Sequence, residues 1–157
     1  MKYSKIVDYF DRGVEGVNEF MKLEEIKIVI DTIEDYQGRF KANMITEESD
    51  LKEGLNILTG LHSETTVIAG ILEAYAETNE ARELLLAKSI PQDDGKGGKK
   101  LPTDEVAKSM SKVNNLIFER TCNLFKAFSK TCSQKIMTCQ SQMNYLKGQK
   151  YMPQEEQ

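Results

Sequence analysis

The reactive side chains of this 157-residue chain are few: one histidine and three cysteines. His62 has no carboxylate at helical spacing, because Glu64 lies two residues away and would face another side of a helix. Cys122, Cys132 and Cys139 show no CxxC spacing and no neighbouring histidine, which argues against a zinc site. We therefore expect a structural histidine, buried thiols, no catalytic residue, and neither a metal ion nor a cofactor.

The segment from Asp93 to Lys100, DDGKGGKK, has the composition of a phosphate-binding loop. It lacks the GxxxxGK[ST] order and the preceding strand that such a loop requires. A solvated linker is the expected structure.

Charge divides the chain more sharply than any motif does. Residues 1–95 carry 10 Lys/Arg against 20 Asp/Glu, whereas residues 96–151 carry 11 Lys/Arg against three Asp/Glu. Such asymmetry points to a nucleic acid, to an anionic surface, or to pairing of one half against the other.

Lysines accompanied by amides and hydroxyls bind phosphate without reading bases. Phe118, Phe125 and Tyr145 would stack on unpaired bases if they were exposed. The predicted nucleic-acid-binding residues are Lys96, Lys99, Lys100, Lys108, Lys112, Arg120, Lys126, Lys130 and Lys135. The alternative is a basic surface that meets solvent, a protein partner or the acidic half of the chain.

A long C-terminal helix is expected to position most of these residues. Apolar or small residues recur every three or four positions from Thr103 to Lys147, which is helical period. Thr103 is the expected N-cap, and Asp104 and Glu105 follow it, where the macrodipole favours negative charge. Several apolar positions recur at 11 residues, which predicts nearly straight packing against neighbours. The predicted oligomer interface comprises Ile117, Leu124, Phe128, Met143 and Leu146.

The rest of the chain also shows helical spacing. Apolar residues keep helical steps from Ser4 to Phe40, and a heptad pattern runs from Leu51 to Ala76, with a candidate break at 60–63. Residues 26–31 alternate as a strand would, but no partner strand is visible, so helix is favoured. Two prolines and three glycines predict a loop at 90–102.

We therefore expect an all-α fold, a long helical hairpin of about 47–88 against 103–147 with an additional N-terminal helix, in a homo-oligomer. The predicted single domain, 1–157, comprises acidic helices at 4–89, the loop at 90–102, the basic helix at 103–147 and a frayed tail at 148–157. The sequence contains no run of about 18 apolar residues, the length that would be needed to span a membrane. The N-terminus has no signal-peptide core, and the odd cysteine count suits a reducing cytoplasm.

One family resemblance adds to this reading. A helix with Glu73, Ala81, Arg82 and Lys88, then a Gly-rich charged loop, then a helix ending in CSQKIMTCQSQMNYLKG (132–148) resembles the recombination mediators of T4-type phages. Proteins of that family are small helical single-strand binders that oligomerise and load a recombinase. The likeness covers the C-terminal half, and the acidic residues 1–53 depart from the pattern.

The resemblance implies a ring-forming, non-enzymatic accessory protein that binds single-stranded DNA through its basic C-terminal half. The acidic N-terminal half would then contact a protein partner or a neighbouring subunit. The alternative is a protein-binding adaptor, or a phage-type inhibitor of a host defence protein, that binds no nucleic acid.

Overall fold

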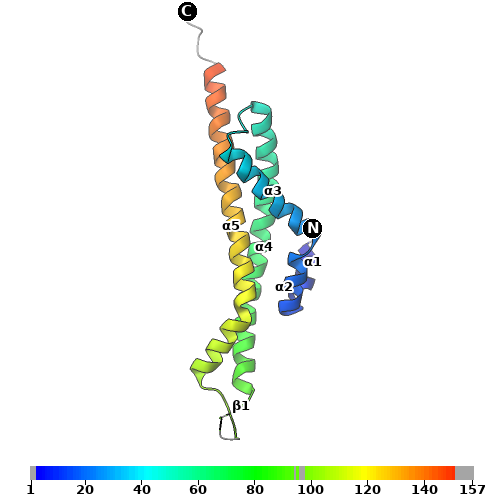
Figure 1. Cartoon of the computed structure of the whole chain (residues 1–157), viewed down its shortest axis with the longest axis vertical. Coiled ribbons are helices and arrows are strands. Elements are labelled where there is room, and N and C mark those ends of the chain that lie inside the picture. The colour runs from blue at the N-terminus through cyan, green and yellow to red at the C-terminus, as the bar shows by residue number, and fades with distance from the viewer. Residues whose placement is uncertain (1–2, 94, 96–97, 151–157) are drawn as a thin grey trace, which may run out of the picture. The chain divides into compact units, whose positions relative to one another are not determined.

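The computed structural model describes residues 3–93, 95 and 98–150, and within them the chain is all-α (Figure 1). In chain order its elements are α1 (Tyr3–Phe10), α2 (Gly13–Met21), α3 (Glu24–Lys41), α4 (Glu48–Ser89), β1 (Gln92–Asp93), β2 (Lys99–Lys100) and α5 (Asp104–Lys150). β1 and β2 pair antiparallel in the segment that joins the two long helices. The predicted fold class, all-α with a long helical hairpin, is confirmed, and three N-terminal helices stand where one additional helix was predicted.

The two long helices begin close to their predicted starts. At the start of α5, the amide nitrogen of Val106 donates to Thr103 Oγ1 at 3.5 Å, as expected of an N-cap. α5 continues to Lys150, so the helix covers the first residues of the predicted tail, and residues 151–157 lie outside the described part of the chain. α4 runs unbroken through the candidate break at 60–63.

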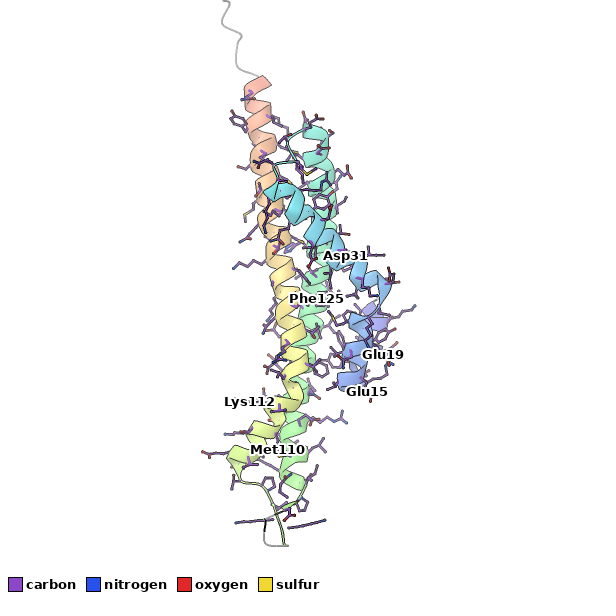
Figure 2. All side chains as sticks on the ribbon, in the orientation of Figure 1. Glu15, Glu19, Asp31, Met110, Lys112 and Phe125 are labelled. Atoms are coloured by element: carbon purple, nitrogen blue, oxygen red, sulfur yellow. The ribbon has the colours of Figure 1, made fainter. Side chains whose placement is uncertain are left out.

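α5 changes direction near Met110 and Lys112, as Figure 2 shows. At this place the Ser111 hydroxyl donates to the Lys108 carbonyl oxygen at 3.0 Å. Serine bonds of this kind, back to the preceding turn, are frequent where helices bend.

The prediction of one N-terminal helix from Ser4 to Phe40 is wrong, because three helices occupy that stretch. Gly13, the first residue of α2, has a φ of 67°, which glycine adopts at little cost. Leu23 is extended and begins α3, which includes residues 26–31 as helix, as predicted.

The chain divides into two compact units. The first consists of Met1–Met21 and Ile68–Leu124, and the second of Lys22–Val67 and Phe125–Gln157. By sequence the first unit carries 11 Lys/Arg against 13 Asp/Glu and the second 10 against 12, so each has a formal charge of −2. Folding thus places acidic and basic segments in the same unit, and the charge division of the sequence does not persist as two charged bodies.

Aromatic side chains form the centre of the first unit. Phe10 lies edge-on to Phe20, with ring centroids 5.0 Å apart, and edge-on to Tyr75 at 5.7 Å. The Tyr75 and Phe118 rings are parallel, 6.5 Å apart. α4 and α5 also meet here through the Cys122 thiol, which lies 3.5 Å from the Ala69 carbonyl oxygen. These contacts hold α1 and α2 against the two long helices.

The second unit has an aliphatic core with two thiols. Its buried members come from α3, α4 and α5 and the segment before α4: Val29, Ile33, Tyr36, Ile45, Leu51, Leu58, Cys132 and Cys139. Burial raises the pKa of Cys132 to about 11 and also raises the pKa of Cys139. Together with Cys122, these cysteines are buried and none of the three forms a disulfide, as expected of structural thiols.

Candidate nucleic-acid interface

The predicted nucleic-acid-binding residues that the structure describes in the first unit lie on β2 and on the first half of α5. Lys99, Lys100, Lys108, Lys112 and Arg120 are exposed. Among the residues the structure describes, none of these five comes within ion-pair distance of a carboxylate. Lys108 and Lys112 are one helical turn apart, so they present two cations on one side of α5 (Figure 2 labels Lys112). The predicted contact Lys96 lies outside the described residues.

In the second unit the basic residues of α5 differ in their surroundings. Lys126 and Lys130 are exposed and one turn apart, but Lys126 already interacts within the chain. Lys135 is half-buried, with its Nζ 5.0 Å from the centroid of the Phe40 ring. That cation–π contact ties Lys135 to α3, so of these three Lys130 is the one best placed to meet an external anion.

Ion pairs lie mostly within the acidic half of the sequence. Arg12 pairs with Glu19 at 2.6 Å, and Lys52 pairs with Glu48 at 2.8 Å. Lys88 Nζ lies 2.9 Å from Asp104 Oδ1, and its hydrogen bond lowers the pKa of that carboxyl. In this last pair the cation, Lys88, comes from the acidic half of the sequence, and the carboxylate, Asp104, comes from the basic half. The expected pairing was the reverse, with cations from the basic half and carboxylates from the acidic half.

The aromatic side chains proposed for base stacking are mainly core residues. Phe118 is 1% exposed and Phe125 is fully buried, so neither presents a ring face to a base. Tyr145 is 66% exposed, and its hydroxyl accepts a hydrogen bond from Gln149 Nε2 at 2.7 Å. Of the three candidates, only Tyr145 has a ring that a base could reach.

His62 has a structural position in the second unit. Its Nδ1 lies 3.0 Å from the Ser129 carbonyl oxygen and 3.0 Å from the Ser129 hydroxyl, which is also 2.7 Å from the Thr66 hydroxyl. These bonds join α4 to α5. Within the described ranges no cluster of His, Cys, Asp and Glu could hold a metal ion, and no helix is long and apolar enough to cross a membrane.

The predicted oligomer interface is divided by the fold. Phe128, Met143 and Leu146 are partly buried against the core of the second unit. Ile117 is half-buried and Leu124 is exposed, both on α5 in the first unit. The structure also exposes Val106, Val113 and Leu116 on α5. Val106 and Val113 belong to the predicted helical repeat, but the repeat alone does not tell which of its sides is covered.

A cavity of about 380 Å³ opens in the first unit between the α1–α2 turn, α4 and α5. Its wall contains Phe10, Phe118 and Tyr75, and the Tyr75 hydroxyl donates to Asp11 Oδ1 at 2.5 Å. Burial, followed by the hydrogen bond to the Asp11 carboxylate, raises the pKa of Tyr75 to about 12. The folded unit thus holds Tyr75 as the neutral phenol.

Tyr75 predicts an alkaline weakening of the fold. Because its pKa is raised above the ordinary value of 10.0, the folded state favours the neutral phenol, and this stabilisation is complete below pH 10. It is lost as the pH rises from 10 through about 12. We expect the unfolding free energy of the Tyr75→Phe variant to decrease less over that pH range than that of the wild type. Urea unfolding at several pH values measures this difference. An unchanged alkaline profile in the variant would contradict the assignment.

Comparison of the chain with protein-family models, with curated proteins and with solved structures finds no match in any of the three.

Proposed function

We propose that the protein is a non-enzymatic, oligomeric accessory protein of nucleic-acid metabolism that binds single-stranded DNA through the basic residues of its C-terminal half. The observation that carries the proposal is the set of exposed cations Lys108, Lys112 and Lys130, which make no ion pair with the described residues. Cations that face solvent without a partner retain their charge for phosphate, and each neutralised phosphate releases condensed counterion.

The surroundings of these cations support binding without base recognition. Exposed amides at Asn123, Gln134 and Gln140 on α5 are suited to hydrogen bonds with phosphate and sugar oxygens. The burial of Phe118 and Phe125 leaves few rings for stacking. The resemblance of residues 132–148 to the recombination mediators of T4-type phages supports single strands as the ligand and loading of a recombinase as the task.

The test reverses the charge of the lysine pair in the first unit. Lys108→Glu with Lys112→Glu should weaken binding to all single-strand sequences alike. It should also make the slope of log affinity against log salt shallower by about 1.4, or 0.7 for each lost phosphate contact. Fluorescence anisotropy of a labelled oligonucleotide over a salt series measures both quantities.

The matched control changes the net charge equally in the acidic half. Lys5→Glu with Lys22→Glu alters two exposed lysines, so long-range repulsion is the same and no proposed contact is lost. We expect the slope to stay at its wild-type value. Equal loss of binding in both double variants would mean that net charge, not the proposed contacts, governs the affinity.

The second candidate function is a protein-binding adaptor or a phage-type inhibitor of a host defence protein. Two observations favour it: each unit has a formal charge of −2, and α5 exposes apolar side chains such as Val113. An adaptor should show no affinity for single strands even at low salt. Binding that is absent in the salt series at its lowest ionic strength would therefore end the nucleic-acid proposal and leave this one.

A further inference from the structure

α5 exposes an apolar stripe in the first unit. Val113 is 70% exposed, and Val106, in the first turn of α5, is 46% exposed. The stripe consists of Val106, Met110, Val113, Leu116, Ile117 and Leu124. The opposite side of the same segment is buried, through Ala107, Ser111, Phe118 and Cys122. The stripe is thus a second apolar face, and it lies on the side of α5 turned away from the core of the unit.

The spacing keeps the stripe on one side of the helix. Val106 and Ile117 are 11 residues apart, and so are Val113 and Leu124. Eleven residues make almost three whole turns, so these side chains follow the helix axis with little drift. A face of this kind fits another helix laid along it.

We infer that this stripe is the contact between two copies of the chain, packed antiparallel about a two-fold axis near Val113. The inference refines the oligomeric part of the proposed function. A two-fold contact requires a surface that is complementary to itself. The charges beside the stripe satisfy that requirement.

Glu105 lies eight residues before Val113, and Arg120 lies seven residues after it. Both are exposed, and at 100° per residue both fall on the same side of Val113, Glu105 at about 80° and Arg120 at about 20° around the helix. In an antiparallel pair, a residue at one distance before the axis lies opposite the partner's residue at the same distance after it. Glu105 of each copy therefore lies opposite the partner's Arg120, which gives two equivalent ion pairs. In a parallel pair in register, Glu105 would lie beside the partner's Glu105, and Arg120 beside the partner's Arg120. Repulsion between these like charges disfavours that arrangement.

The change of direction near Met110 and Lys112 is compatible with this pairing (Figure 2). It divides the stripe into two arms, Val106–Met110 and Ile117–Leu124, and antiparallel packing sets the first arm of one copy against the second arm of the other. Lys108 and Lys112 point at least about 100° around the helix from Val113. Lys108, at about 140°, therefore stays outside the contact, whereas Lys112 lies at its edge, on the side of the helix that carries Glu105.

The test measures molecular mass in the absence of DNA, by sedimentation over a range of concentrations. We expect the wild type to form a dimer or an assembly of dimers. Val113→Glu should yield a monomer with unchanged helical circular dichroism, because the side chain is exposed within the chain. Arg120→Glu and Glu105→Arg should each weaken association about tenfold, because symmetry makes each substitution act at two places. The two substitutions together should restore it.

Three results would overturn the inference: a wild-type monomer at all concentrations, a Val113→Glu variant that associates normally, or a double charge exchange that fails to restore association. An assembly with an odd number of copies would do the same, since it cannot be built from two-fold pairs alone. A monomer that binds single strands would refute this contact and leave the DNA-binding proposal in place. A dimer that binds no single strands would refute DNA binding and leave this contact in place.

Discussion

Phe118→Ala is expected to lower the free energy of unfolding by about 3–5 kcal/mol, the range for removing a buried aromatic ring from a packed core. Phe118 is 1% exposed and touches two further aromatic residues, Tyr75 and Phe10, with centroids 6.5 Å away in each case. It also forms part of the wall of the cavity in the first unit. Its loss would enlarge an existing cavity, which the neighbouring helices are poorly placed to fill.

Urea unfolding followed by circular dichroism measures this effect, and Leu85→Ala is the control. Leu85 is also a large apolar side chain of the first unit, but it is 71% exposed. Its replacement should change stability by no more than about 0.5 kcal/mol. Similar losses in the two variants would contradict the placement of Phe118 in the core.

The long helices could be predicted because their signals are local. Thr103, Asp104 and Glu105 mark the start of α5 through a cap and two charges, and all of these act within one turn. The prolines and glycines of 90–102 separate α5 from α4 in the same local way. Apolar period then identifies the helices without any knowledge of their neighbours.

The division of the N-terminal segment could not be predicted from that period. Apolar residues keep their helical steps across Gly13 and Leu23, because each of the three short helices needs the same kind of apolar face as one long helix. What separates them is the positive φ at Gly13 and the extended backbone at Leu23. Neither backbone conformation follows from the spacing of apolar residues.

The spacing of apolar residues also does not predict which side of α5 is buried. The structure buries Ser111 and Asn115, and hydrogen bonds satisfy both: the Ser111 hydroxyl donates to the Lys108 carbonyl oxygen, and the Asn115 side-chain oxygen accepts from Asn79 Nδ2 at 3.2 Å. A pattern that counts apolar residues assigns such polar positions to the surface. It correspondingly placed Val106 and Val113 on packed positions, and the structure exposes them.

The exposure of the candidate cations was easier to predict than their partners. Exposed lysines on a helix follow directly from residue type, and Lys108, Lys112 and Lys130 are exposed as expected. Which cations stay without a partner depends on contacts distant in sequence. Lys135 shows this, because its neighbour Phe40 is on α3.

Gly16→Ala should destabilise the first unit by about 3 kcal/mol or more, at or above the upper end for overpacking a close contact. Gly16 is buried on α2, and an added Cβ would overlap the Tyr9 carbonyl oxygen of α1 and come within 3.0 Å of Arg12 Cβ. Backbone cannot rotate away as a flexible side chain does, so α1 must move. That movement would disturb the Phe10–Phe20 contact, which is 5.0 Å between centroids.

Gly70→Ala is the matched control, and it is expected to raise the free energy of unfolding where Gly16→Ala lowers it. Gly70 lies within α4 in the first unit, and an added Cβ there meets no atom within 4 Å. The methyl group removes backbone freedom from the unfolded chain and should stabilise the helix by up to about 1 kcal/mol. Both variants gain the same helix propensity, so the difference between their urea midpoints isolates the contact of α2 with α1. Gly16→Ala that is as stable as Gly70→Ala would show that α1 and α2 do not pack this closely in solution.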